Sequence, residues 1–187
     1  MFFHASQVPN IKVLMPHLSV HGKPLVYFST KRENVLVYLS NAIEKHCNSI
    51  GYKHTGPFKK WGSYGFTSDG ILQLDEYYPA ATIETYKGVS GFIYSTRKIA
   101  NCKELPTIPY SVVSVNSVSV DSCEFIADAY TALLEAAEQG KIILTRYENN
   151  SKDKINWITE SVIREYGQAR SNPEYQLFLK AKFNFIT

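Results

Sequence analysis

The chain has 187 residues, of which 44% are hydrophobic and 20% charged, so it can bury a substantial core and does not have the composition of a disordered protein. Its formal net charge of +3 argues against binding of a polyanion through bulk charge, although a local nucleic-acid contact stays open. Three separated cysteines argue against a disulfide framework, and no stretch approaches the roughly 20 apolar residues of a membrane span. We therefore expect a single cytoplasmic domain over residues 1–187.

The first predicted elements are short strands. Residues 2–6 and 11–15 are apolar runs that end before proline, and residues 17–22 read as a loop. Residues 25–30 are rich in branched and aromatic side chains, which fit a pleated, partly buried surface. We therefore predict a strand over residues 25–30, with Tyr27 near its centre.

A helix is predicted directly after this strand. Thr30 and Glu33 have the spacing of a capping box, in which each side chain satisfies a backbone N–H at the other position. Apolar residues at mainly helical spacing follow, and Gly51 offers a left-handed stop. The pattern predicts one helix over residues 31–50, with Cys47 in the core.

Residues 52–78 lose this periodicity and are rich in glycine and aromatic residues, with a short hairpin expected around residues 71–77. Long aromatic loops on a rigid scaffold are often binding surfaces. Several basic residues and one ring could contact phosphate here, although a solvated loop is the simpler interpretation: Lys53, His54, Lys59, Lys60 and Trp61.

The second half of the chain mixes strands and helices. Asp128 is a predicted cap for a helix that Gly140 ends, while Ser151 and Pro173 open two helices in the tail. Strands are expected over residues 91–95, 112–120 with a break at 116–117, 124–126 and 141–147. Without regular βαβ alternation this order predicts an α+β fold.

The organisation expected from these elements is a core over residues 1–147 and a C-terminal helical extension over residues 148–187. The two helices of the extension are expected to pack on the core or to join two copies in a homodimer.

Metal and nucleotide motifs are weak. His17 and His21 have the i,i+4 spacing of a zinc-binding pair, but Pro16 and Gly22 leave too short a segment for a helix, and no glutamate lies between them. We therefore expect no metal site. The chain has no glycine-rich phosphate-binding motif, which disfavours ATP, GTP and Rossmann-type dinucleotide binding.

Three short motifs instead resemble those of a known family. Phe3-His4-Ala5-Ser6 resembles the His-Gly-Ser/Thr motif that opens the catalytic domains of ADP-ribosyltransferases, with Ala5 in the glycine position. Gly22-Lys23-Pro24-Leu25-Val26-Tyr27-Phe28-Ser29 resembles their Gly-x-Gly-x-Tyr-Phe-Ala strand. Cys123-Glu124-Phe125-Ile126 is similar to the strand that carries the glutamate of the His-Tyr-Glu class. The layout resembles the poly(ADP-ribose) polymerase superfamily and its rifamycin ADP-ribosyltransferase-like branch.

The resemblance implies two small mixed or antiparallel sheets that form a cleft for NAD, with flanking helices. It implies that His4 bonds a ribose hydroxyl, that Tyr27 stacks on nicotinamide, and that the catalytic Glu124 bonds the 2′-hydroxyl of the nicotinamide ribose. A carboxylate there stabilises the positive charge that develops as nicotinamide leaves. Further cofactor-binding residues implied by the motifs are Ala5, Ser6 and Ser29.

The expected reaction is transfer of ADP-ribose from NAD to an unidentified acceptor, with release of nicotinamide. Asp121 and Glu84 stay open as alternatives to Glu124, since both lie near plausible strand segments. Ser122 stands where arginine-specific transferases have a second acidic or amide residue, which argues against arginine as the acceptor. The alternative function is a non-catalytic binding module that uses the aromatic loop over residues 52–78.

Overall fold

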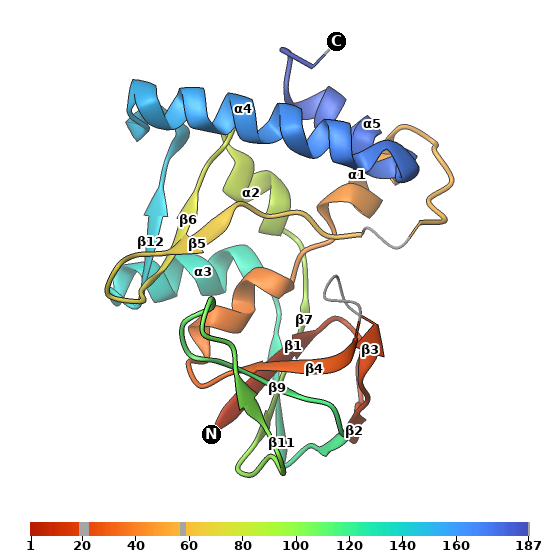
Figure 1. Cartoon of the computed structure of the whole chain (residues 1–187), viewed down its shortest axis with the longest axis vertical. Helices are drawn as coiled ribbons and strands as arrows, with labels where there is room; N and C mark the ends of the chain where they lie inside the picture. Colours follow the sequence, from red (N-terminus) through yellow and green to blue (C-terminus); the bar gives the residue numbers. More distant parts are fainter. Residues whose placement is uncertain (19–22, 57–58, 187) are drawn as a thin grey trace.

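A computed structural model describes residues 1–18, 23–56 and 59–186 of the chain. The fold is α+β, as the sequence predicts, and the strands of these described residues lie in three separate sheets. Figure 1 shows the largest sheet at one end of the molecule, near the N-terminus, and the C-terminal helices at the other end.

The largest sheet is antiparallel at every strand pair. Its strands follow in the order β11 (Ser122–Ile126), β7 (Gly91–Thr96), β1 (Phe2–Ser6), β4 (Pro24–Ser29), β9 (Ser111–Ser114) and β8 (Lys103–Glu104), with β3 (His17–Leu18) beside β4.

Two halves of this sheet meet between β1 and β4. Every residue of β1 pairs with β7, whereas β1 and β4 share a single registered pair, Phe3 with Ser29. We call the line between β1 and β4 the seam. Because the backbone ladder is so short there, side chains have to satisfy backbone groups along the rest of the seam.

The two smaller sheets lie beside the large one. They are formed by β10 (Val118–Ser119) with β2 (Val13–Leu14), and by β12 (Ile142–Thr145), β6 (Leu72–Asp75) and β5 (Tyr64–Phe66). The predicted hairpin near residues 71–77 is confirmed as β5 and β6, although it begins earlier in the chain. The predicted break at residues 116–117 is also confirmed, because it separates β9 from β10.

Helices cover these sheets. They are the 3₁₀ helix η1 (Glu33–Tyr38), α1 (Ala42–Ser49), α2 (Ala81–Tyr86), α3 (Ala129–Glu138), η2 (Tyr147–Asn149), α4 (Lys152–Gln168), η3 (Ala169–Ser171) and α5 (Pro173–Lys182). The predicted helix starts are confirmed: Asp128 accepts from the backbone of Thr131, Ser151 accepts from that of Lys154, and Pro173 is the first residue of α5. Gly51 and Gly140 have the left-handed backbone expected of helix ends.

The single helix predicted over residues 31–50 is wrong, because η1 and α1 replace it. The capping box is wrong too: no side chain caps η1, and the Thr30 hydroxyl lies 3.4 Å from the carbonyl oxygen of Tyr110, to which it donates. The break follows from long-range contacts, since buried Ser40 donates its hydroxyl to the carbonyl of Trp61 at 2.9 Å. That bond fixes a turn before α1 starts.

Two further differences concern short elements. The loop predicted over residues 17–22 begins with β3, and residues 19–22 lie outside the described residues. The sequence prediction also missed α2, which begins after Ala80 in a left-handed conformation.

Three hydrophobic clusters form the core. One fills the space between the large sheet, η1 and α3, and it includes Ala5, Leu36, Ile93 and Leu133. A second packs the C-terminal helices against α1 and α2, with Cys47 fully buried in it as predicted. The third lies on the other face of the large sheet. In the part of the chain that the structure describes, no helix is long and apolar enough to cross a membrane.

Candidate functional site

His4 and Tyr27 meet at the seam. The imidazole Nδ1 of His4 lies 2.8 Å from the backbone oxygen of Tyr27 on the neighbouring strand. The register with β7 places His4 beside Tyr94 on one face of the sheet, whereas Tyr27 projects from the other face together with Ser29 and Phe3. The histidine ring therefore takes the place of a backbone donor along the seam, and it contacts the Tyr27 backbone rather than its ring.

The protonation of His4 follows from this contact. Burial lowers the pKa of His4, the bond to the Tyr27 carbonyl opposes that shift, and the nearby Lys60 and His17 lower the pKa further. The ring is thus neutral at neutral pH. Since a carbonyl oxygen can only accept, Nδ1 carries the proton, and Nε2 presents a lone pair that can accept a hydrogen bond.

Tyrosines and one lysine lie next to the seam. Lys60 donates from Nζ to the backbone oxygen of Tyr38 at 2.7 Å, and the hydroxyl of Tyr64 donates to that of Tyr38 at 3.3 Å. Burial raises the pKa of Tyr38, with further contributions from Tyr64 and from Tyr27, so the hydroxyl stays protonated. We call His4, Tyr27, Tyr38, Lys60 and Tyr64 the seam cluster.

The seam cluster offers donors and positive charge. Burial lowers the pKa of Lys60, and its ammonium group has three protons, of which the Tyr38 carbonyl takes one. The basic group of His17 lies on the Tyr27 face, because it pairs with Leu25 in the register of β3 and β4.

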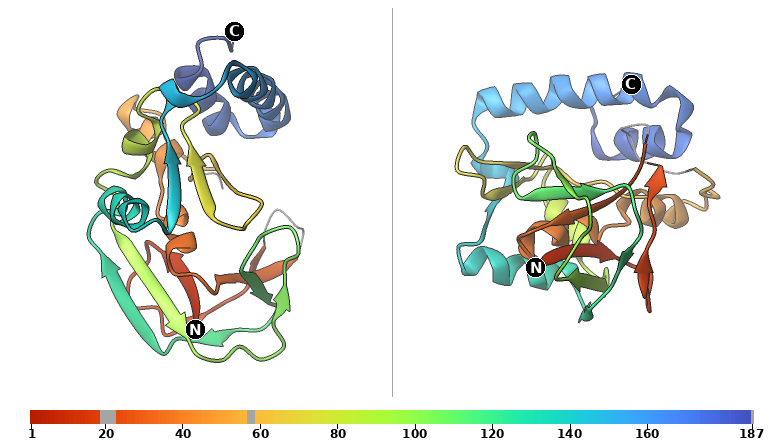
Figure 2. Two further views of the ribbon diagram at one scale, coloured as in Figure 1. Left: turned by 90° about the vertical axis from the view of Figure 1, so that its left-hand side faces the viewer. Right: turned by 60° about the horizontal axis from the view of Figure 1, so that its bottom comes forward.

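The β5–β6 hairpin closes over the loop that precedes β9 (Figure 2). Gly70 at its turn has a φ of +77°, and a Cβ added there would lie 3.1 Å from the Tyr110 ring. Tyr110 is itself left-handed, and its carbonyl accepts from the backbone N–H of Thr30 at 2.9 Å. This contact fixes the hairpin, and with it Tyr64, relative to the end of β4.

Glu124 lies at the far edge of the same sheet face. Its register partner is Ile93, and the strand order puts β7 and β1 between Glu124 and Tyr27, a separation of about 14 Å at ordinary strand spacing. Arg32 holds Glu124 through two hydrogen bonds of 2.8 and 2.5 Å and lowers the pKa of that carboxyl. Fully buried Leu36 belongs to the core cluster that covers this sheet face.

The two alternative acids also have partners outside the seam cluster. Asp121 accepts from the backbone N–H of Arg97 at 2.7 Å, and Glu84 accepts from Lys182 at 2.5 Å. The structure therefore brings the His4 ring to the Tyr27 backbone, with the two side chains on opposite sheet faces, and it joins none of the three predicted acids to them.

The remaining motif residues have local roles. Ala5 is buried in the core beneath η1. The hydroxyl of Ser6 accepts from the backbone N–H of Val8 at 3.1 Å, and that of buried Ser29 accepts from the backbone of Lys31 at 3.1 Å. Two of these side chains, Ala5 and Ser29, thus have almost no surface to offer a ligand.

The predicted aromatic loop contributes mainly to the core. Trp61 and Tyr78 are buried against α5 and its C-terminal end, whereas Tyr64 keeps 39% of its surface exposed. Residues 57 and 58 of this loop lie outside the described residues, as does His21 of the predicted histidine pair. Among residues 1–18, 23–56 and 59–186, no group of three or more side chains could hold a metal ion.

Sequence reasoning missed two of the three tyrosines of the seam cluster, Tyr38 and Tyr64. In the sequence prediction Lys60 could contact phosphate, with a solvated loop as the simpler interpretation, whereas Tyr38 falls inside a predicted helix and Tyr64 inside a predicted loop. Their joint position depends on how β5 lies against η1, for which the sequence has no local signal.

No family model, curated protein or solved structure matches the chain. The relationship to ADP-ribosyltransferases therefore remains a resemblance of short motifs.

Proposed function

We propose that the chain binds NAD at the seam and transfers its ADP-ribose group to an acceptor, with release of nicotinamide. The observation that supports this most is the 2.8 Å hydrogen bond between His4 and the Tyr27 backbone, because it joins the two residues that carry the resemblance. Those residues are 23 positions apart in the chain, and the short ladder between β1 and β4 is what allows the contact.

Each group of the seam cluster suits one part of NAD. The ligand would have to reach both sheet faces at the seam, because Nε2 of His4, on the Tyr94 face, accepts a hydrogen bond from a ribose hydroxyl. The half-buried Tyr27 ring offers a face on which the planar nicotinamide stacks. Lys60 supplies positive charge for the two phosphates, and Tyr38 supplies a hydroxyl donor.

The reaction breaks the bond between the nicotinamide nitrogen and ribose C1′ and forms a bond between C1′ and the acceptor nucleophile, whose proton passes to solvent. Positive charge develops on the ribose, and a carboxylate nearby would stabilise it. Glu124 is paired with Arg32 at the far edge of the sheet. We therefore assign NAD binding to the seam cluster and give Glu124 a structural role.

The test measures nicotinamide released from NAD by the full chain, with protein, nucleic-acid and small-molecule acceptors supplied in turn. The wild-type chain and Glu124→Gln should release nicotinamide at similar rates, whereas His4→Ala should lose most of the release. If Glu124→Gln alone abolishes release while its thermal unfolding is unchanged, the carboxylate is catalytic and our assignment of it is wrong. If the wild-type chain neither binds nor consumes NAD, the proposed function is wrong.

A second candidate is a non-catalytic NAD-binding module. The partners of the three predicted acids favour it, because Glu124 pairs with Arg32, Asp121 with the Arg97 backbone and Glu84 with Lys182. Calorimetric titration distinguishes the two functions, because a binding module would take up NAD stoichiometrically and release no nicotinamide over hours.

A further inference from the structure

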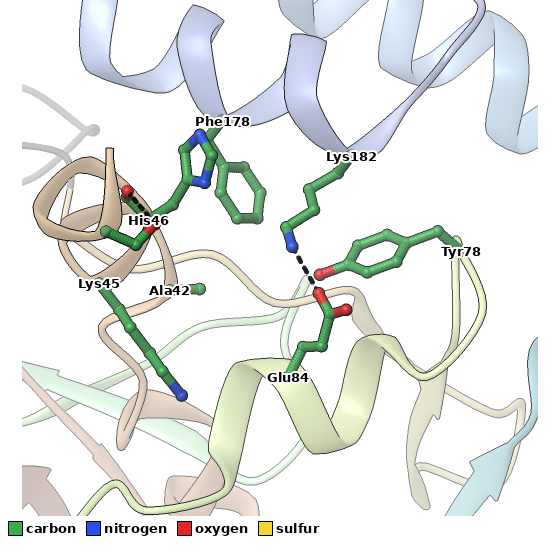
Figure 3. Close-up of a pocket in the computed structure, with 8 residues that line it drawn as sticks. Ala42, Lys45, His46, Tyr78, Glu84, Phe178 and Lys182 are labelled. Atoms are coloured by element: carbon green, nitrogen blue, oxygen red, sulfur yellow. Dashed lines mark hydrogen bonds and ion pairs between the residues drawn. The ribbon is translucent and has the colours of Figure 1, made fainter. Parts of the chain in front are cut away.

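A pocket separate from the seam cluster lies between α1, α2 and α5 (Figure 3). Its volume is about 240 Å³, below the range of roughly 300–1,000 Å³ typical of drug-sized ligands, so it suits a smaller molecule. The lining combines a buried floor with a polar rim: Ala42, Lys45, His46, Ser49, Tyr78, Glu84, Phe178 and Lys182.

The floor of the pocket is aromatic. Phe178 and Tyr78 are 1% and 7% exposed, and the His46 ring meets Phe178 edge-on with 6.0 Å between centroids. Ala42 is the smallest side chain of the lining, and the Lys182–Glu84 pair lies between the two rings (Figure 3). Such a floor favours a ligand with an aromatic ring, because aromatic rings pair through offset or edge contacts.

The charges on the rim do not cancel. Lys182 and Glu84 form an ion pair of 2.5 Å, with the Lys182 ammonium also 5.5 Å from the centre of the Tyr78 ring, so these two charges neutralise each other. Lys45 also lines the pocket from α1, and its side chain extends away from the Phe178 and Tyr78 rings (Figure 3). Its ammonium donates to the backbone oxygen of Lys87 at 3.4 Å, and in the described part of the chain no carboxylate pairs with it.

We propose that this pocket binds a small aromatic carboxylate, with its ring on Phe178 and Tyr78 and its carboxylate at Lys45. A carbonyl contact leaves the charge of Lys45 uncompensated, and a carboxylate would neutralise it through a charge-assisted hydrogen bond. Ser49 and the neutral imidazole of His46 line the pocket from the same helix, and the Ser49 hydroxyl donates to the His46 carbonyl at 2.7 Å. This site does not depend on NAD binding at the seam.

The test is a calorimetric titration of the full chain with phenylacetate, phenylacetamide and 2-phenylethylamine, which share a ring and differ in charge. Phenylacetate should bind at least about tenfold more tightly than the other two, the effect of one charge-assisted hydrogen bond. Lys45→Gln should remove that preference. Lys141→Gln, which changes an exposed lysine before β12, should retain it.

Ser49→Trp provides a second variant, since Ser49 is exposed and a large ring there should block the pocket without entering the core. Equal affinity for the three probes, tighter binding of the amine, unchanged preference in Lys45→Gln, or no binding of phenylacetate at millimolar concentration would each overturn the proposal.

Discussion

The two ends of one sheet face differ in charge and in partners. Around Tyr27 the polar groups are basic or hydroxylic and leave donors available, whereas Glu124 at the other edge is neutralised by Arg32. The strands β1 and β7 and the buried core beneath η1 separate the two ends. Two residues on the same sheet face, such as Tyr27 and Glu124, therefore need not belong to one site, because apolar packing can lie between them.

The largest effect, a change in NAD affinity, is expected at the end of the sheet face that carries Tyr27. Tyr27→Ala should weaken NAD binding by about 1–3 kcal/mol, or roughly 5-fold to 150-fold, because stacking on an aromatic ring contributes that much for nucleobases. Tyr27→Phe keeps the ring and should bind like the wild type. Calorimetry on the three proteins gives the comparison, and equal affinities would remove Tyr27 from the site.

The packing of the 3₁₀ helix η1, which covers the sheet between its two ends, can be tested through Asn34. This side chain is 5% exposed, and neither of its amide atoms has a hydrogen-bond partner within the described residues. Because a buried unsatisfied amide is unfavourable, Asn34→Leu should raise the free energy of unfolding by about 1–3 kcal/mol. Urea unfolding measures the change, with Asn34→Ala as the smaller control. A destabilised Asn34→Leu would show that the amide has a partner or that leucine does not fit.

The same core depends on the start of α3. Asp128 accepts from the backbone of Thr131 at 2.8 Å and from that of Gly88 at 2.6 Å, and these bonds outweigh burial and lower the pKa of the carboxyl. Asp128→Ala should cost about 1 kcal/mol of stability, a typical value for a helix cap. Since the folded pKa is below the unfolded one, this stability is present above about pH 4 and is lost as the pH falls further.

Thermal unfolding of wild type and Asp128→Ala at neutral and acidic pH checks this prediction. The gap between the two melting temperatures should close in acid. A gap that stays constant with pH would mean that the carboxylate charge does not stabilise α3.

The smallest effect on stability and on NAD affinity is expected at the end of the sheet face that carries Glu124. Glu124 and Arg32 are half-exposed, and exposed ion pairs contribute about 0–1 kcal/mol. Glu124→Gln should therefore change stability little at neutral pH and leave NAD affinity unchanged. Arg32 lowers the pKa of Glu124, so even this small contribution disappears as the pH falls below about 4.5. A large loss of NAD affinity in Glu124→Gln would contradict this and show that Glu124 and Tyr27 belong to one NAD-binding site.

Local signals in the sequence predicted local structure well. Asp128, Ser151 and Pro173 act on backbone groups within a few residues, and each starts a helix as expected. The helix predicted over residues 31–50 failed because Ser40 is fixed by the distant Trp61 backbone.

The candidate site shows the same limit. His4 and Tyr27 could be paired from their motifs, since β1 and β4 are adjacent strands. The contributions of Tyr38 and Tyr64 require the placement of β5 against η1, and the distance of Glu124 from Tyr27 requires the order of four strands. Neither arrangement is encoded in short-range spacing, so neither could be read from the sequence.

The most direct test of NAD binding at the seam is nitrogen NMR of the histidine rings during titration with NAD. The chain has five histidines, and His4 should appear as a neutral ring protonated at Nδ1. We predict that saturating NAD shifts the Nε2 resonance of His4, as a ribose hydroxyl donates to it, and leaves His46 unchanged. An unperturbed His4 resonance at saturating NAD would contradict the assignment of the site.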